Sequence, residues 1–211
     1  MRRASLDRTT DLASGVVLAG GRSSRFGAED KLRAELDGMP LLHHPIRRLA
    51  EVTGDVVVVL APDDEEPVGP SGVSVRFARD AREDEGPLEG VLAGLVMVDR
   101  ELAAVAGGDM PGLSSSVLRA MIRVAAERSA AAVVLQDGDR FRPLPAVVRV
   151  TPSRTAAERL LRDGERSLRA WLRALAPTVI GEAEWTALDP ERRTLRDVDE
   201  PSDVESGRSP P

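Results

Sequence analysis

The sequence predicts an α/β protein with a Rossmann-like, doubly wound and mostly parallel sheet. Apolar runs of strand length occur at 15–19, 56–61 and 102–106, without the polar alternation of a half-exposed strand. Such runs are typical of parallel strands that are buried on both faces. Amphipathic segments of helical period separate these runs, as in βαβ units. From about residue 130 the pattern changes to hairpin-like strands at 130–135 and 145–150, which predict a small antiparallel extension.

The helices follow from the spacing of apolar residues. Leu42, Pro45, Ile46 and Leu49 share one helical face, and Pro45 must lie in the first turn for this helix to form. A second helix opens at Gly86. The remaining elements that we expect are a helix at 117–125 capped from 114–116, a helix ending near 161, a helix around 168–175, a final helical turn at 201–205, and short strands at 32–36, 73–77, 178–180 and 194–198.

Composition restricts the class of protein. A chain of 211 residues predicts a single domain, which we assign to 14–205, between a flexible arm at 1–13 and a polar tail at 206–211. The net charge of −6 and an aromatic content of 2% argue against nucleic-acid binding and against an anionic membrane surface. The absence of Cys, of an apolar N-terminal segment and of a run of about 18 apolar residues leads us to expect a cytoplasmic protein.

A glycine-rich, basic loop follows the first apolar run. Gly20 and Gly21 let the main chain turn sharply, and Arg22, Arg25 and Lys31 add positive charge. Backbone N–H groups of such a loop can converge on a phosphate. The spacing fits neither a Walker A loop nor a G-x-G-x-x-G dinucleotide loop. An ordinary surface turn with solvated charges is the alternative.

Asp109 is the second candidate site residue. It follows the apolar run at 102–106 within the segment Gly-Gly-Asp-Met-Pro, at the strand end where α/β sheets bind ligands. A carboxylate in this place suits Mg²⁺, which proteins hold by one or two carboxylates plus substrate phosphates. The alternative is that Asp109 caps the following helix. His43 and His44 are the only histidines, and we interpret them as packing or surface residues rather than metal ligands.

The loop Leu-Ala-Gly-Gly-Arg-Ser-Ser-Arg-Phe-Gly at 18–27, with Lys31 after it, resembles the signature of the MobA-like nucleotidyltransferases. The segments around Gly86 and Asp109 resemble that family's G-P-L-A-G and G-D-M-P motifs, and 197–203 resembles its closing N-x-N-T-P-x-D motif. Lys31 lies one residue farther from the loop than in the tightest form of the signature. Together the similar segments extend from about residue 15 to residue 203.

The resemblance implies a nucleotide-diphospho-sugar transferase-like fold with an acceptor-side antiparallel extension, and transfer of GMP from GTP onto molybdopterin with Mg²⁺ and release of pyrophosphate. It implies a small-molecule enzyme, with transient contact to molybdoenzymes or cofactor-handling proteins. The residues implied are Arg25, Lys31 and Asp109 for catalysis; Leu18, Ala19, Gly20, Gly21, Arg22, Ser23, Lys31, Asp80, Gly86, Pro87, Leu88 and Asp109 for the nucleotide; Arg142, Pro143, Arg166 and Ser167 for the acceptor; and Asp109 and Asp199 for the metal.

Several alternatives stay open. Asp80 matches a base-contacting aspartate and could accept hydrogen bonds from guanine, but Ala61-Pro62 replaces an Asn of relatives. Asp197 and Asp199 replace asparagines, which favours a cytidylyltransferase. Ser167 could simply cap the next helix. A nucleotidyltransferase for another phosphorylated metabolite, or a non-catalytic nucleotide-binding module, are further hypotheses.

Overall fold

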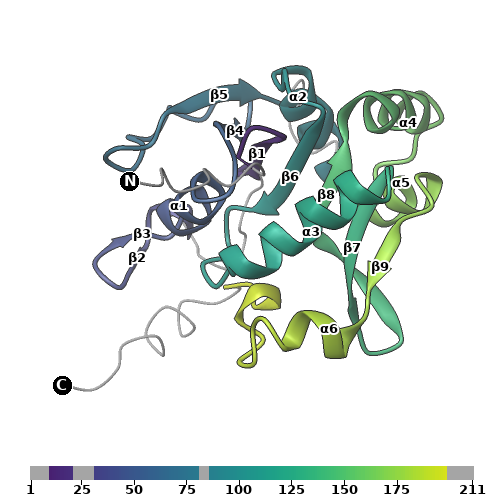
Figure 1. Cartoon of the computed structure of the whole chain (residues 1–211). Helices are drawn as coiled ribbons and strands as arrows, with labels where there is room; N and C mark the ends of the chain where they lie inside the picture. Colours follow the sequence, from purple (N-terminus) through teal and green to yellow (C-terminus); the bar gives the residue numbers. More distant parts are fainter. Residues whose placement is uncertain (1–9, 21–30, 81–85, 199–211) are drawn as a thin grey trace, which may run out of the picture.

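The computed structural model describes residues 10–20, 31–80 and 86–198. Within these residues, seven strands form one sheet in the order β5-β4-β1-β6-β8-β7-β9 (Figure 1). The strands are β1 (Ala13–Leu18), β4 (Val56–Leu60), β5 (Val75–Arg79), β6 (Leu102–Gly107), β7 (Ala132–Asp137), β8 (Arg140–Arg149) and β9 (Thr178–Ile180). A separate hairpin consists of β2 (Glu35–Leu36) and β3 (Met39–Pro40).

The predicted fold class is confirmed, and the antiparallel part has a definite place in it. β5, β4, β1 and β6 pair in parallel, whereas β8 runs antiparallel to both β6 and β7. β7 then pairs in parallel with β9. The extension therefore continues the sheet, and its β7–β8 hairpin turns at Gly138, which has a positive φ of 59°.

Helices cover both faces of the sheet. Alternate strand residues such as Val16 and Val17 point into two different cores, as the period of two requires. On one face lie α1 (His43–Ala50), α3 (Ser115–Glu127) and α6 (Glu182–Thr186), with α3 crossing in front of β7 and β8 in Figure 1. On the other lie α2 (Pro87–Val96), α4 (Val150–Arg162) and α5 (Leu168–Ala174).

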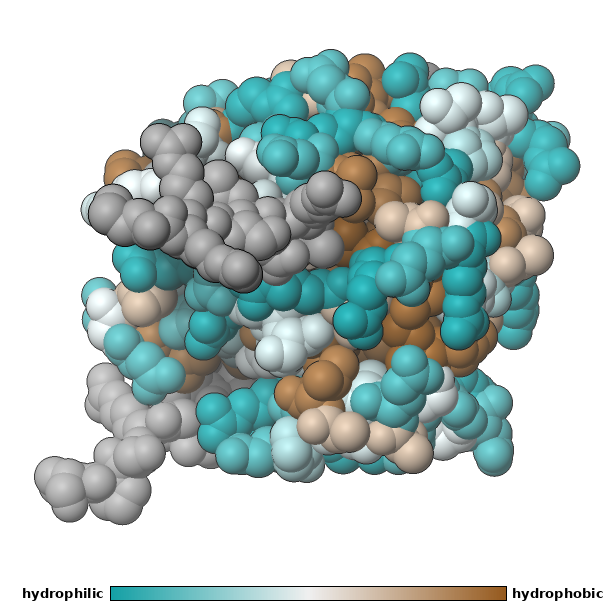
Figure 2. All heavy atoms as spheres, in the orientation of Figure 1, coloured by the Kyte–Doolittle hydropathy of each residue, from teal (hydrophilic) through white to brown (hydrophobic). Residues whose placement is uncertain are grey.

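Large apolar side chains fill both cores. Trp185 of α6 is 1% exposed and packs with the first core, whereas Trp171 of α5 is completely buried in the second. Each indole N–H has a partner: Trp185 Nε1 donates to the Gln136 carbonyl and Trp171 Nε1 donates to the Ser153 carbonyl. On the face seen in Figure 2, hydrophobic side chains form small clusters separated by hydrophilic ones.

Some predicted elements were wrong. Residues 32–36 do not form one strand: the 3₁₀ turn η1 (Lys31–Arg33) precedes the two-residue strand β2. The strand expected at 194–198 is instead the 3₁₀ turn η2 (Arg193–Leu195), held by a hydrogen bond of 2.7 Å from the Thr194 N–H to Asp189 Oδ2. The strand expected at 145–150 begins earlier, at Arg140, and ends where α4 begins at Val150.

Other helix predictions were confirmed. Pro45 lies in the first turn of α1, and Ser114 caps α3. The histidines pack as interpreted, since His43 Nε2 bonds the Val68 carbonyl and His44 Nε2 bonds the Leu36 carbonyl. The helical turn expected at 201–205 lies outside the described residues, as do 1–9 of the arm and the tail, so the domain division stays a prediction. None of the described helices is long and apolar enough to cross a membrane.

Glycine brings α2 close to the sheet. Gly90 and Gly94 lie on its inner side, where their neighbours are side chains. A Cβ on Gly94 would lie 2.6 Å from Val16 Cγ1 and 3.0 Å from Val59 Cγ2. The absence of a side chain at Gly94 lets α2 seat directly on the valines of β1 and β4.

Candidate functional site

The carboxyl ends of β1, β4 and β6 meet at one edge of the sheet. Leu18 is in register with Val59 on one side and with Gly107 on the other. The main chain stays paired beyond the strands, since the Ala19 N–H donates to the Val59 carbonyl at 2.8 Å and the Gly108 N–H donates to the Leu18 carbonyl at 2.9 Å. The start of the glycine loop and the Gly-Gly-Asp segment therefore leave the sheet side by side (Figure 1).

The start of the glycine loop is tightly packed. A Cβ on Gly20 would lie 3.0 Å from the Ala61 nitrogen and 3.2 Å from the Leu60 carbonyl carbon. Glycine at position 20 therefore lets the loop pass directly over the end of β4. The predicted site residues Gly21, Arg22, Ser23 and Arg25 lie outside the described residues, and Lys31 begins η1.

Asp109 lies at the same edge, just beyond β6. Its carboxylate folds back over the strand end: a Cβ on Gly107 would come within 2.5 Å of Asp109 Oδ1. Its carbonyl accepts a hydrogen bond of 2.9 Å from the Val198 N–H. Asp109 does not cap the following helix, because α3 begins at Ser115 and its N-terminal hydrogen bond goes from the Val117 N–H to Ser114 Oγ.

Asp80 and the start of α2 lie beside β1. The Asp80 N–H donates to the Leu60 carbonyl at 2.9 Å, so this residue follows β5 at the same edge. A Cβ on Gly90 would lie 3.4 Å from Asp80 Oδ2 and 3.7 Å from Leu18 Cδ2. The Asp80 carboxylate is therefore next to the first turns of α2, on the side that faces Leu18 of β1 and Val59 of β4.

The Gly-Pro-Leu segment shapes the helix start through its backbone. Gly86 has φ 88°, a left-handed conformation that favours glycine, and Pro87 occupies the first helical position. The Leu88 side chain is completely buried, so it packs in the core rather than facing a ligand. What this segment offers a nucleotide is the N-terminus of a ten-residue helix with its unsatisfied N–H groups.

Of the predicted acceptor residues, Arg166 lies against this helix start. A Cβ on Gly86 would be 3.0 Å from Arg166 Cβ, so Arg166 packs on the Gly86 segment. Arg166 Nη1 donates to the Leu161 carbonyl at 2.8 Å. Ser167 Oγ accepts a hydrogen bond from the Ala170 N–H at 3.3 Å and caps α5, as the alternative interpretation had it.

Arg142, another predicted acceptor residue, binds the C-terminal end of the described chain. Pro143 follows it in β8. Arg142 Nη2 donates to Asp197 Oδ2 at 2.8 Å and to the Leu195 carbonyl at 3.3 Å. This pair holds the segment whose Val198 N–H bonds Asp109. The hairpin and the Asp109 loop are thus linked through residues 195–198.

The sequence did not reveal a second ion-pair cluster on the hairpin. Arg192 donates to Asp137 Oδ1 at 3.0 Å and to the Glu182 carboxylate, and its guanidinium lies 5.3 Å from the Trp185 ring centroid. The Arg192 hydrogen bond, with a second from the Gly138 N–H, lowers the pKa of Glu182. The only local signal was the Asp-Gly turn at 137–138, because its partners Glu182 and Arg192 lie 44 or more residues away.

The metal-binding capacity of this edge rests on few groups. In the part of the chain that the structure describes, no three His, Cys, Asp or Glu side chains cluster as metal ligands. The second predicted ligand, Asp199, lies outside the described residues. A single carboxylate in a glycine cradle at a strand end nevertheless fits Mg²⁺, because most of its ligands at such sites are water and substrate phosphates.

Comparison with known proteins identifies the family at this point. Residues 15–179 match the model of the MobA-like NTP transferase domain. The chain belongs to this family. The matched region contains the whole strand-end edge from β1 to β6, the hairpin and α5.

The curated relatives share about half of their length with the chain. A probable molybdenum cofactor guanylyltransferase of Natronomonas pharaonis is 36% identical over 114 residues, which cover 53% of this chain and 56% of the relative. A protein of the same name from Methanosarcina acetivorans is 35% identical over 122 residues, covering 55% of this chain and 54% of the relative.

Solved structures share the fold over nearly the whole chain. Molybdopterin-guanine dinucleotide biosynthesis protein A of Archaeoglobus fulgidus superposes with a TM-score of 0.73 at 20% identity, over 92% of this chain and 96% of that one. The 4-diphosphocytidyl-2C-methyl-D-erythritol synthase of Anaerococcus prevotii superposes with a TM-score of 0.67 at 15% identity, over 94% and 97%. At these identities the similarity concerns the fold.

Proposed function

We propose that the chain is a Mg²⁺-dependent nucleotidyltransferase that moves GMP from GTP onto molybdopterin and releases pyrophosphate. The observation that carries this proposal is the meeting of the start of the glycine loop (18–20), Asp109, Asp80 and the start of α2 at one edge of the sheet. The names of the curated relatives, molybdenum cofactor guanylyltransferase, support this donor and this acceptor.

In this proposal the chain binds the triphosphate mainly through its main chain. The glycine loop from Leu18 to Ser23 wraps the phosphates, with Gly20 packed close to β4 so that N–H groups can approach them. Arg25 and Lys31 neutralise the charge of the departing pyrophosphate, a role taken from the family resemblance. The α2 N-terminus, at Gly86 and Pro87, adds the favourable end of a helix dipole.

Asp80 recognises the base of the nucleotide. Its carboxylate lies beside α2 and can accept hydrogen bonds from the N1–H and the 2-amino group of guanine. Cytosine presents no such pair of donors on its Watson–Crick edge, so a GTP preference follows from this residue.

The reaction needs positioning more than side-chain nucleophiles. A phosphate oxygen of the acceptor attacks the α-phosphorus, the bond to the bridging oxygen breaks, and pyrophosphate leaves. Asp109, with Asp199 as a second ligand, would hold Mg²⁺, which when bound would supply a positive charge beside the phosphates. Arg142, Pro143, Arg166 and Ser167 form the acceptor side; the packing of Arg166 on Gly86 brings that side next to the nucleotide helix. We expect the protein to act in the cytoplasm and to pass its product to molybdoenzymes or cofactor-handling proteins.

The alternative is a cytidylyltransferase for the same cofactor, and Asp197 is the observation that favours it. Its aspartate identity is typical of cytidylyl-transferring relatives. In the structure, however, Asp197 pairs with Arg142 at 2.8 Å, which gives it an anchoring role that is independent of the base.

Pyrophosphate release tests the proposal. The protein is incubated with Mg²⁺, molybdopterin and each of the four nucleoside triphosphates in turn, and we expect release with GTP alone. Release with CTP alone would favour the alternative. Nucleotide binding without release in any reaction would contradict the proposed acceptor or the catalytic role.

The variant Asp80→Asn isolates base recognition. An amide cannot accept from both guanine donors with its nitrogen, so KM for GTP should rise by about tenfold or more while kcat changes less. The matched control is Asp63→Asn, an exposed aspartate in the loop after β4. Equal KM values in both variants would remove Asp80 from the base site.

A further inference from the structure

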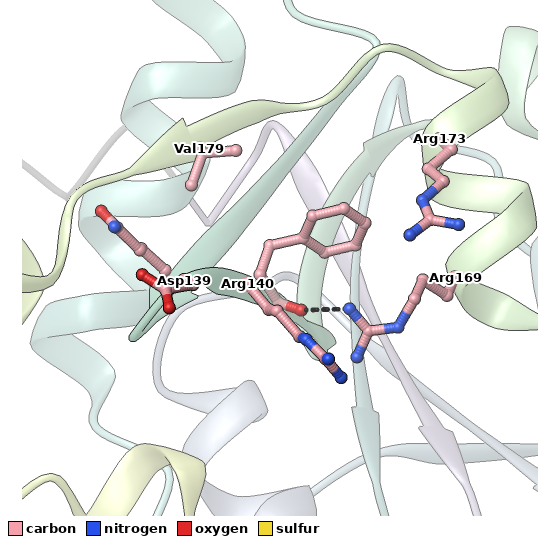
Figure 3. A pocket seen from close by; sticks show the side chains of 7 residues that line it. Asp139, Arg140, Arg169, Arg173 and Val179 are labelled. Atoms are coloured by element: carbon pink, nitrogen blue, oxygen red, sulfur yellow. Dashed lines mark hydrogen bonds between the residues drawn. The ribbon is translucent and has the colours of Figure 1, made fainter.

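A separate pocket lies on the far side of the β7–β8 hairpin from β6. It has a volume of about 410 Å³ and is lined by Gln136, Asp139, Arg140, Phe141, Arg169, Arg173 and Val179. These residues come from the hairpin, α5 and β9. In Figure 3, Arg169 and Arg173 of α5 lie on one side of the pocket, and Asp139 and Val179 lie on the other. None of them was a predicted site residue.

The charge of this pocket is positive. It contains three guanidinium groups and one carboxylate, that of Asp139, and hence a net charge of +2. Within residues 10–20, 31–80 and 86–198, no carboxylate forms an ion pair with Arg140, Arg169 or Arg173. Within these residues, the positive charge of the three pocket arginines is therefore not balanced by ion pairs.

The helix that carries two of these arginines concentrates the charge. Arg169 and Arg173 are four residues apart on α5 and lie on the same side of it. Like charges at this spacing destabilise a helix. A bound anion would remove that repulsion, since it would interact favourably with both guanidinium groups.

Flat and apolar groups complete the pocket. The Arg169 guanidinium lies 5.3 Å from the Phe141 ring centroid, and its Nη1 donates to the Phe141 carbonyl at 2.9 Å. Arg169 is thereby fixed on Phe141 as part of a flat wall. Val179 is 45% exposed on the edge strand β9 and supplies an apolar surface.

We propose that this pocket binds a phosphomonoester attached to a planar ring, with the phosphate held by Arg140 and Arg173 and the ring placed against the wall of Phe141 and Arg169. A phosphomonoester carries close to −2 at pH 7, which complements the net charge of the lining. Asp139 offers a hydrogen-bond acceptor for a ring N–H group. The volume suits a small phosphorylated metabolite.

Two kinds of ligand have this chemistry, and the titrations below distinguish between them. The ligand is either the acceptor of the transfer reaction, in which case the inference rests on the proposed function, or a separate phosphorylated metabolite. The pocket lies on the same face of the sheet as α2, and α5 begins two residues after Arg166, which packs on Gly86. An acceptor bound there would approach the nucleotide from the α5 side.

Calorimetric titration with phenyl phosphate tests the binding itself. The full chain is titrated in the presence of saturating GTP and Mg²⁺, so that the nucleotide site is filled, and again without them. We expect phenyl phosphate to bind in both cases and benzyl alcohol, which lacks the phosphate, not to bind. Absence of phenyl phosphate binding to the unmodified protein would overturn the proposal whether or not the protein transfers nucleotides.

Variants locate the binding. Arg140→Gln and Arg173→Gln should each weaken phenyl phosphate binding by roughly tenfold. The matched control Arg123→Gln lies on α3, on the opposite face of the sheet, and should keep its affinity. Circular dichroism and thermal unfolding verify that each variant folds. Equal affinity in all three variants would overturn the proposal.

Titration with molybdopterin distinguishes the sources. If the double variant Arg140→Gln/Arg173→Gln loses both molybdopterin and phenyl phosphate binding, the pocket holds the acceptor. If it loses phenyl phosphate binding alone, the pocket holds a separate phosphorylated metabolite. Retention of phenyl phosphate binding in this double variant would contradict both.

Discussion

Different interactions hold the charged side chains at the two edges of the parallel sheet. At the amino ends of the strands, charged groups satisfy one another: Ser14 Oγ donates to Asp55 Oδ1 at 2.6 Å, and Arg76 Nη2 donates to Asp55 Oδ2 at 2.5 Å. Arg100 Nε lies 3.8 Å from the same carboxylate. Burial raises the pKa of Asp55, but the hydrogen bonds from Ser14 and Arg76 and the two guanidinium charges lower it overall.

At the carboxyl ends, glycines and main-chain hydrogen bonds place the carboxylates of Asp109 and Asp80. Asp109 occupies space that the missing side chain of Gly107 leaves open, and Asp80 lies in the space beside Gly90. The amino-end edge holds its charges in mutual hydrogen bonds, whereas the carboxyl-end edge holds the two carboxylates that the proposed function assigns to the ligand. Substitutions at the two edges should therefore separate stability from activity.

Asp109→Asn should have the largest effect. Loss of the negative charge removes the metal ligand, so we expect kcat for pyrophosphate release to fall by about 10²–10⁴-fold with little change in melting temperature. Asp99→Asn, an exposed aspartate near the amino-end edge, is the matched control and should keep full activity. Full turnover by Asp109→Asn would place the metal elsewhere.

Gly107→Ala tests whether the space beside Gly107 positions the Asp109 carboxylate. The new Cβ would lie 2.5 Å from Asp109 Oδ1, so the carboxylate must shift while the strand backbone stays in place. A displacement of about 1 Å can lower a rate by about a hundredfold, and we expect a fall of this size in kcat. Steady-state kinetics and thermal unfolding are measured on the same preparation. A large loss of stability with normal kcat would contradict the positioning role.

Asp55→Ala should act in the opposite way. It leaves the buried Ser14 hydroxyl and the Arg76 guanidinium without this partner, at a cost of about 1–3 kcal/mol in the free energy of unfolding. Urea denaturation measures this cost. Asp99→Ala is the control, because the Asp99 side chain is 93% exposed and should contribute little. Catalytic constants should be unchanged in both variants if the two edges act independently.

Acid should weaken the amino-end edge through the same residue. The pKa of Asp55 is lowered in the folded state, so its contribution to stability is complete above its unfolded pKa of about 3.9 and is lost as pH falls through the folded value. Glu182, whose pKa is also lowered, acts in the same direction. Urea midpoints between pH 6 and pH 3 should fall less steeply for Asp55→Ala than for the unmodified protein, and parallel curves would contradict this linkage.

Ser114→Ala should have the smallest effect. It removes the N-cap of α3, the helix that follows the Asp109 loop, and should cost about 1 kcal/mol of stability. Ser116→Ala is the matched control on an exposed position of the same helix. Because the Asp109 carboxylate is held by Gly107 rather than by the helix cap, kcat should be unaffected; a parallel loss of kcat would show that the cap also positions the site.

The positions of the segments proposed to bind the nucleotide could be predicted from the sequence because their signals are local. A run of apolar residues followed by Gly20 predicts both where β1 ends and where the chain turns. The same holds for Asp109 after β6. Residues 21–30 and Asp199 lie outside the described part of the chain, so their predicted roles stay predictions.

The C-terminal half was less predictable because its signals are long-range. Arg142 was a candidate for acceptor binding, yet its partner Asp197 lies 55 residues away and no local pattern joins them. α6 was missed because five residues are too few to show a helical period, although Trp185 depends on it for burial. The arginine pocket brings together residues from the hairpin, α5 and β9.

The sequence by itself determined the α/β class, the parallel strands and the loops at their carboxyl ends, since apolar runs and glycines act through burial and backbone freedom within a few residues. Only the tertiary structure decided that β8 inserts antiparallel between β6 and β7, that Arg166 packs on Gly86, and that three arginines line one pocket. The reason is physical: hydrogen bonds between strands and ion pairs between side chains depend on distance in space, which residue order alone does not specify.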